Sequence, residues 1–581
     1  MSAEPESASA PRWRVAALDV LVALVVAGLG AKAGYGAATA RDLDLVDEGS
    51  YAMCAARVAD NGLPAVEGSP LYIAWECGLL ALGTPLDELT HASWAGLAVL
   101  LPLSIFVLAR ALGAGRCAAL AVAGFVPATT LIDVWPYPLH LAACVLALGT
   151  ALAVRLPRAL GGAALGLACL TATYARPEFW YSVLLFALIA LVGAVVAVRR
   201  GRGRAAARAA GAFAVGAAVL VLAFGSPAPT GARSAVAFGQ HYTFNRFLAG
   251  EPIPSPWQQW ETFFREDFGD ADGVSSALRN NPRAFFWHVR RNAARAPEVL
   301  TSVALPRLDF TFLNAPHVWI GPPLPTAPHA RAEAIAGRVV AGIVALGLLG
   351  FAFGLRNWRR GEQSARPLPT GALALVLVVA PAAAASLLVF PRFHYAVPTV
   401  AFCAALAAAG FRHLPLRLPA LGARGEVVAL VLIATLLGFV VPNRAKGVCV
   451  QSKMWKSGGG QRIVALPTFS RDSVRAMRAL GLPPETAVLD HTAGREFFAG
   501  FTGPVHDPFA LPPGTNLREF VTRTNVGLIV IDPTCASCPA LKDDPEMKEL
   551  AAGRETPTFR IVPATDPPAI LLAVRRDLLP K

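Results

Sequence analysis

Residues 179–198, FWYSVLLFALIALVGAVVAV, form an uncharged apolar stretch between Glu178 and Arg199. A helix of about twenty such residues is about 30 Å long, which is the thickness of the hydrocarbon core of a bilayer. Comparable stretches begin near ten other positions: Val15, Ser93, Cys117, Pro138, Ala159, Ala206, Gly337, Gly371, Ala396 and Glu426. The sequence therefore predicts a mainly α-helical, polytopic membrane protein with about 11 transmembrane helices.

Composition supports a membrane class. The chain of 581 residues is 55% hydrophobic and 16% charged, with a mean hydropathy of +0.49, which excludes an ordinary soluble globule. Its net charge of +13 lies in short basic bursts between apolar stretches, so a nucleic-acid partner is not expected. The first apolar stretch lacks a clear small-residue cleavage site, which favours a retained helix. Residues 70–83 form a shorter apolar stretch with Glu76, which suits an interfacial helix.

The arginines indicate an orientation. They gather at alternate connections, for example at 199–208 and 356–366, whereas the short connections between them hold only Arg176 and Arg392. Because cytoplasmic loops are enriched in arginine, this asymmetry predicts a cytoplasmic amino terminus. Three larger pieces then lie outside the cell membrane: residues 39–91, 225–338 and 442–581.

The tail differs in character from the rest of the chain. Helical periodicity at 470–480 alternates with strand-like apolar stretches at 486–489, 526–532 and 569–574. This alternation predicts a small extracytoplasmic α/β domain at 442–581, which follows a transmembrane module at 1–441.

An acidic segment follows the first apolar stretch. If residues 45–60 are helical, Asp44, Asp47, Glu48 and Tyr51 share one face, because their spacing is i, i+3, i+4 and i+7. One reading is structural: Asp44 caps the helix and the other acids complement its dipole. The other reading is that the carboxylates serve a chemical function.

The segment Asp47-Glu48-Gly-Ser-Tyr51 resembles the Asp-Glu-x-x-Tyr motif in the first external loop of the glycosyltransferase C superfamily. Pro70-Leu71 and Trp75 also match that loop, and the resemblance is to family 39-like members, namely protein mannosyltransferases and bacterial aminoarabinose or lipopolysaccharide-core sugar transferases. Many of these carry Lys-Pro-Pro where this chain has Gly68-Ser69-Pro70, so a phosphate contact of that lysine is not carried over.

The resemblance implies a membrane enzyme that transfers a sugar from a polyprenyl-phosphate donor to a saccharide, lipid or protein acceptor of the cell envelope. It implies location in the bacterial inner membrane and an active site on the outer face. The lipid phosphate is a good leaving group, so one carboxylate can act as general base, and direct displacement inverts the anomeric centre. Asp47 is the expected base, Glu48 is the second catalytic candidate, and Tyr51 is expected to contact substrate. No cofactor and no metal are expected, although an oligosaccharyltransferase-like divalent cation is the alternative.

The donor phosphate needs cations, and Arg176 and Arg392 stand at the predicted outer ends of helices. Arginine binds phosphate in a bidentate manner. Glu178 and His394 accompany them as substrate-binding candidates. The alternative is that the arginines reach the interface or pair with Glu178 and Asp133.

Two further outer residues, Asp133 and His140, are pocket-lining candidates. The mixture of aromatics and amides at 240–246 and 257–260 suits either stacking on sugar rings or packing at a membrane surface.

The pair Cys535-Ala-Ser-Cys538 favours a structural disulfide over a metal site, because no second ligand pair accompanies it. Two rival functions remain open. A transporter or flippase predicts ionisable residues deep within the spans, where few occur, and a non-catalytic envelope-assembly protein would act through its tail.

Overall fold

The computed structural model describes most of the chain, in two compact units. The described ranges are 12–35, 43, 45, 47–132, 137–230, 232–253, 256–257, 259–304, 311–313, 330–361, 367–414, 422–441, 448–453, 462–465, 469–492, 494–536, 538–564 and 570–579. The unit that we call the helical unit comprises residues 1–35, 63–72 and 94–447. The mixed unit comprises residues 36–62, 73–93 and 448–581.

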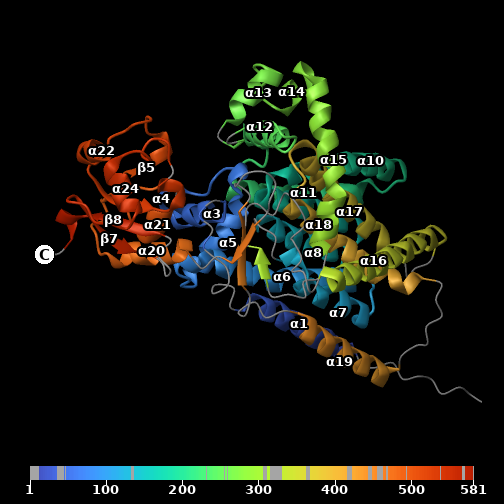
Figure 1. The fold of residues 1–581 in the computed structure, drawn as a ribbon. Coiled ribbons are helices and arrows are strands. Elements are labelled where there is room, and N and C mark those ends of the chain that lie inside the picture. Colours follow the sequence, from blue (N-terminus) through green and yellow to red (C-terminus); the bar gives the residue numbers. More distant parts are fainter. Residues whose placement is uncertain are drawn as a thin grey trace, which may run out of the picture. The chain divides into compact units, whose positions relative to one another are not determined.

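Long helices make up most of the helical unit (Figure 1). Those in or beside candidate spans are α1 (Arg12–Gly34), α6 (Leu89–Ala111), α7 (Arg116–Phe125), α8 (Pro138–Arg155), α9 (Arg158–Ala175), α10 (Trp180–Arg199), α11 (Gly203–Phe224), α16 (Ala330–Arg359), α17 (Leu368–Leu388), α18 (Phe393–Gly410) and α19 (Ala423–Val440). Nine helices of the described chain are long and apolar enough to cross a bilayer. The prediction of a mainly α-helical, polytopic membrane protein is confirmed.

The remaining two predicted spans are helical but less suited to crossing. α7 has 10 residues and passes into a 3-10 turn at Val126–Ala128, because Pro127 cannot donate the next helical hydrogen bond. α9 has 18 residues, but it is not apolar enough to count among the nine. The sequence therefore located these helices correctly and overestimated the length of α7.

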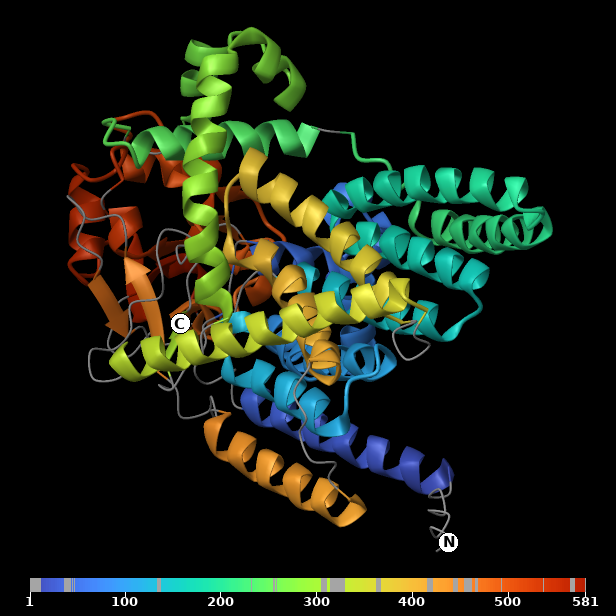
Figure 2. The same ribbon diagram turned by 90° about the vertical axis from the view of Figure 1, so that its right-hand side faces the viewer.

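Close helix packing in this unit depends on small residues. A Cβ atom at Gly410 of α18 would collide with the carbonyl oxygen of Gly347 in α16, and one at Gly350 would collide with Gly410. Small residues let helix backbones approach at such crossings. α1 and α19 lie side by side in both ribbon views (Figures 1 and 2), and Lys32 donates to the carbonyl oxygen of Gly438.

The long connection before α16 is also helical. It contains α12 (Ala232–Phe247), α13 (Trp260–Phe268), α14 (Val274–Asn280), α15 (Pro282–Ala304) and the short strand β1 (Thr311–Leu313). A buried polar network fixes α15, because Asn245 of α12 donates to Asn292 at 2.8 Å and Asn292 donates to the Leu387 carbonyl oxygen at 2.9 Å. Such fully hydrogen-bonded networks hold helices in one register.

The mixed unit contains α3 (Asp47–Ala56), α4 (Val58–Asn61) and, from Ile73 onward, α5 (Pro70–Ala81). The predicted helix at 45–60 is therefore divided after Ala56, and the predicted helix at 70–83 is present.

The tail forms a five-stranded sheet of order β5-β4-β6-β8-β7, with β4 parallel to β5 and β6, and β8 antiparallel to β6 and β7. β6 is buried along its whole length, as expected for a strand that is covered on both faces. The predicted helix and strands are confirmed. The tail elements are β2 (Val448–Lys453), β3 (Arg462–Ala465), α20 (Phe469–Ala479), β4 (Ala487–Leu489), α21 (Arg495–Ala499), β5 (Val505–His506), α22 (Leu517–Thr524), β6 (Val526–Ile531), α23 (Pro533–Ala536), α24 (Pro545–Ala551), β7 (Phe559–Pro563) and β8 (Leu571–Arg575).

Candidate functional site

The acidic segment forms the start of α3. The helix begins at Asp47 instead of Leu45, so Asp47 and Glu48 lie in its first turn, where negative charge complements the helix dipole. Glu48 is 1% exposed and Tyr51 is 6% exposed, and Ala52 lies on the same buried face. Glu48 and Tyr51 therefore point into the protein and do not form a solvated face.

Two of the predicted residues in this segment have undescribed side chains. Asp44 lies outside the described residues, and only the backbone of Asp47 is described, as the first residue of α3. The expected roles of Asp44 as a cap and of Asp47 as a base stay predictions.

A second buried carboxylate, Glu76, belongs to the same unit. Glu76 is 0% exposed and lies on α5. The next residue, Cys77, connects α5 to α3, since its thiol donates to the Ala55 carbonyl oxygen at 3.5 Å. Burial, and to a lesser extent the charge of Glu76, raises the pKa of Cys77. Sequence reasoning used Glu76 only to place an interfacial helix, although an acid within an apolar stretch was a signal for function.

In the helical unit, Arg176 follows α9 and forms an ion pair. Its Nε donates to Glu178 Oε1 at 3.0 Å, and the side chains are 8% and 13% exposed. This is the pairing that the alternative reading predicted. The charge of Arg176 is thus compensated by a neighbour two residues away, within a largely buried turn.

Arg392, which precedes α18, is held by a histidine that sequence reasoning missed. Its Nη2 donates to His241 Nε2 at 2.6 Å, and its Nε donates to the same atom at 3.2 Å. The Nδ1 atom of His241 lies 2.6 Å from the Ala237 carbonyl oxygen. Because a carbonyl oxygen only accepts, Nδ1 carries the proton and Nε2 accepts from the guanidinium. Burial, together with the charge of Arg392, holds the pKa of His241 well below its usual range, so the imidazole is neutral.

Charged groups from distant parts of this unit act on one phenol. Tyr395 in the first turn of α18 is 8% exposed, and the charges of Glu178, Arg176, Arg392 and Arg233 lie close enough to act on its hydroxyl group. The ring of His394, which is 2% exposed, lies 4.3 Å from the Tyr395 ring. The Arg176–Glu178 pair after α9 and Arg392 before α18 therefore lie within electrostatic range of the same tyrosine, next to His394.

The two pocket-lining candidates have different outcomes. Asp133 lies outside the described residues. His140 lies at the start of α8, where its Nε2 atom is 2.8 Å from the Leu131 carbonyl oxygen and its ring packs edge-on against Tyr137. His140 is 1% exposed, so in this structure it joins a helix to the preceding turn.

The aromatic residues of α12 pack against one another. Phe238 and Tyr242 belong to a buried cluster with Phe264, Phe268 and Phe285. The Tyr242 hydroxyl donates to Asp267 at 2.5 Å. These rings form a core, so stacking on a sugar ring is not supported at Phe238 or Tyr242.

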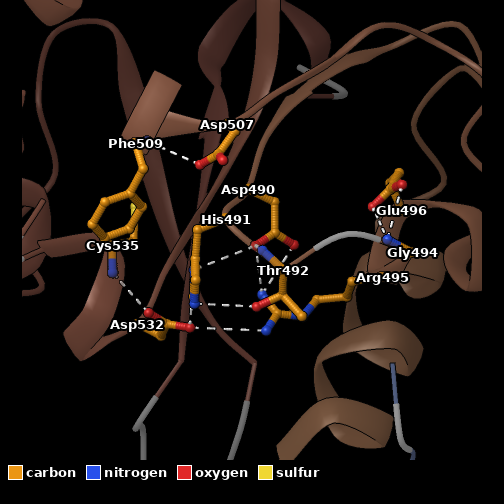
Figure 3. A network of polar contacts seen from close by, with 10 residues as sticks. All are labelled: Asp490, His491, Thr492, Gly494, Arg495, Glu496, Asp507, Phe509, Asp532 and Cys535. Atoms are coloured by element: carbon orange, nitrogen blue, oxygen red, sulfur yellow. Dashed lines mark hydrogen bonds and ion pairs between the residues drawn. The ribbon is translucent and has the colours of Figure 1, made fainter. Parts of the chain in front are cut away.

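A separate polar cluster occupies the tail (Figure 3). Asp490 follows β4, Asp507 follows β5 and Asp532 follows β6, and the three strands are parallel, so the carboxylates share one edge of the sheet. Arg495 Nη1 donates to both Asp490 oxygens at 3.0 Å, and its Nη2 lies 3.8 Å from Asp532. His491 Nδ1 lies 3.5 Å from Asp532.

This cluster holds a loop. Arg495 and Asp490 have side chains that are 4% and 0% exposed, and the Asp490 carboxylate also accepts from the Thr492 backbone at 3.0 Å. Burial raises the pKa of Asp490 to about 7 against the lowering effect of Arg495. Asp507 accepts from the Phe509 backbone at 2.9 Å and so caps a turn. The contacts therefore form a buried ion-pair network that fixes residues 490–495.

The predicted disulfide is wrong. Cys535 and Cys538 are free thiols, and the Cys538 thiol donates to the Pro508 carbonyl oxygen at 3.1 Å. Burial raises the pKa of Cys535, which keeps this thiol neutral within the core. In the described part of the chain, no group of three or more His, Cys, Asp or Glu side chains could hold a metal ion.

No protein-family model matches the chain, and no curated protein matches it. Among solved structures, it is similar to ArnT from Cupriavidus metallidurans, which was determined bound to undecaprenyl phosphate, with 15% identity and a TM-score of 0.33 over 99% of this chain and 100% of that chain. It is also similar to the arabinofuranosyltransferase AftD from Mycobacteria, with 14% identity and a TM-score of 0.36 over 98% of this chain and 42% of that chain. At such low identities and TM-scores, these likenesses establish neither a family nor a reaction.

Proposed function

We propose that the protein is a membrane glycosyltransferase that moves a sugar from a polyprenyl-phosphate donor to an acceptor of the cell envelope. The observation that carries the proposal is that Arg176 and Arg392 lie at helix ends of a polytopic helical unit, within electrostatic range of Tyr395, against whose ring His394 packs. Buried cations at helix ends are costly, and they suit an anionic group that approaches from the lipid. A lipid phosphate has this chemistry.

Arg392 is the leading phosphate ligand. His241 orients its guanidinium through a neutral nitrogen and therefore adds no negative charge to it. Arg176 and Glu178 form the neighbouring ion pair, and His394 is the third cationic candidate. Asp133 and His140 stay proposed as lining residues of the donor pocket.

Asp47 is the proposed general base. It would take the proton of the acceptor hydroxyl while the acceptor oxygen attacks the anomeric carbon and the bond to the lipid phosphate breaks. One displacement of this kind inverts the anomeric centre. Glu48 and Tyr51, which share the buried face of α3, would orient the acceptor and substrate. No metal or cofactor takes part in this scheme.

The arginine asymmetry supports an amino terminus in the cytoplasm and a site on the outer face of a bacterial inner membrane. A transporter or flippase is the alternative function. It would move a lipid-linked saccharide without cleaving it, so the two functions differ in whether free polyprenyl phosphate appears.

The test compares cells that carry Asp47→Asn, Glu48→Gln or Arg392→Ala with wild type. Surface glycans and lipid-linked sugars are quantified by mass spectrometry. We expect the lipid-linked sugar to accumulate and the glycan product to fall about 100-fold, because each change removes a charge to which the proposal assigns a part in the transfer.

Matched controls are Asp60→Asn in the exposed part of α4 and Arg199→Ala at the exposed end of α10. Both should leave the glycans and lipid pools unchanged. If all three site variants insert normally and behave like the controls, the transferase proposal is wrong.

A further inference from the structure

The tail domain belongs to the same compact unit as the acidic helix. This unit combines the tail with residues 36–62 and 73–93, although hundreds of residues separate these segments in the sequence. The contacts between the tail and these two segments therefore show how the tail can hold α3 in place.

The first contact surface is formed by the loop before α21. Gly494 has φ of +97°, and a Cβ atom there would lie 3.3 Å from the Met53 side chain and 3.6 Å from the Leu45 carbonyl oxygen. The Arg57 guanidinium, just after α3, lies 4.5 Å above the Phe497 ring of α21. Residues before, within and just after α3 therefore lie close to the same short stretch of the tail.

That stretch is held rigidly. The ion pair between Asp490 and Arg495 brackets Gly494, whose backbone N–H donates to the Glu496 carboxylate at 3.1 Å (Figure 3). The buried ion-pair network of residues 490–495 thus fixes the part of the tail that contacts α3.

The second contact surface is α20, which meets the segment after α5. Arg471 Nη2 donates to a His91 ring nitrogen at 2.8 Å, and both residues are buried. Asp87, whose side chain is 8% exposed, lies 3.8 Å from Arg475 and 3.6 Å from Arg478. Arg478 also donates to the Phe498 carbonyl oxygen at 2.9 Å, which ties α20 to α21. The contact surface at α21 and the contact surface at α20 are therefore joined by a hydrogen bond.

We propose that the C-terminal domain positions the acidic helix, with Phe497 and Arg57 as the positioning residues that set the orientation of α3. This role rests on the proposed function, since it concerns the helix that carries Asp47 and Glu48. Positioning matters because small displacements of a catalytic group lower the rate strongly. The tail then contributes to turnover without touching substrate.

The experiment uses the full chain in native membranes or vesicles and the variants Phe497→Ala and Arg57→Ala. We expect turnover to fall about tenfold while the donor KM changes less than about twofold, because the donor phosphate contacts are untouched. Amide hydrogen exchange of residues 47–56 should become faster in both variants. The double variant should be no worse than either single variant within about twofold, because the two side chains form one contact.

Two controls separate positioning from general damage to the tail. Phe497→Tyr keeps the aromatic face and should retain wild-type turnover. Arg523→Ala removes a similar exposed arginine, which lies 6.0 Å from Phe520 within the tail, and should leave turnover and exchange of 47–56 unchanged. Equal losses in Phe497→Ala and Arg523→Ala would overturn the positioning role.

The outcomes distinguish this inference from the proposed function. If Asp47→Asn is inactive but Phe497→Ala turns over and exchanges like wild type, the positioning role is wrong and the transferase proposal stands. If Asp47→Asn is fully active, the proposed catalytic role fails. Amide hydrogen exchange of residues 47–56 that is slower or unchanged in Phe497→Ala would then also overturn the positioning role.

Discussion

Arg392 in the helical unit and Arg495 in the tail are both partly or wholly buried, but their partners differ. Arg495 donates to both oxygens of a buried carboxylate, so its charge is compensated inside the fold. Arg392 donates to a neutral imidazole, which orients the guanidinium and adds no charge. A buried carboxylate thus neutralises Arg495 within the tail, whereas His241 orients Arg392 without contributing charge, and we propose that Arg392 binds an anion.

The largest expected effect is on the stability of the tail. Above pH 7, where Asp490 is ionised, Arg495→Ala would leave a buried carboxylate without its main counter-charge, and breaking such a pair typically costs about 3–5 kcal/mol. We expect the tail of this variant to be cleaved readily by a protease that leaves the wild-type tail intact. A tail as resistant as that of the wild type would show that the ion pair is dispensable and would weaken the comparison.

The next effect is on activity. Arg392→Ala should reduce transfer about 100-fold, which corresponds to about 2.7 kcal/mol, while the protein inserts and resists proteolysis as wild type does. Arg392→Lys should recover only part of the activity, because an ammonium group cannot form the bidentate contact. Full activity in Arg392→Ala would show that Arg392 does not bind the donor phosphate.

A third prediction concerns pH. The pKa of Asp490 is raised to about 7 by burial, so the folded tail binds a proton more tightly than the unfolded tail does. This contribution is fully present below the unfolded pKa and is lost as pH rises from about 4 through 7. Wild type should therefore lose about 2 kcal/mol of tail stability between about pH 5 and 8, relative to Asp490→Asn. Pulse proteolysis across this range measures the difference, and parallel curves for the two proteins would contradict the raised pKa.

The smallest effect is expected at His241. His241→Ala should raise the donor KM about tenfold, because Arg392 loses an acceptor that helps to orient it. His241→Gln offers an amide oxygen as a replacement acceptor and should stay within about threefold of wild type. An equal defect in both variants would indicate that the residue fills space and does not orient Arg392.

Sequence patterns predicted the spans because the length of an apolar stretch is a local property. The helix at 470–480 and the strands near 486–489 and 526–532 were also found from local periodicity and composition. Pro127 was the local signal for the short α7, and it was overlooked. The acidic face was located through spacing, since Glu48 and Tyr51 are three residues apart.

The partners of these groups could not be predicted in the same way. His241 and Arg392 are separated by 151 residues, and Phe497 lies far along the chain from Arg57. These pairs form only when distant helices pack, so no local pattern reveals them. For Cys535 and Cys538, a local pattern led to a wrong prediction. Their spacing favoured a disulfide, but both are free thiols, and the Cys538 thiol donates to a carbonyl oxygen in the core.

The most direct test of the central claim uses the purified full-length chain in vesicles made from lipids of its native membrane, supplied with polyprenyl-phosphate sugars and envelope acceptors. Mass spectrometry follows the release of free polyprenyl phosphate. We predict release by wild type and by Asp60→Asn, and about 100-fold less release by Asp47→Asn. Equal release by wild type and Asp47→Asn, or no release by wild type, would contradict the account.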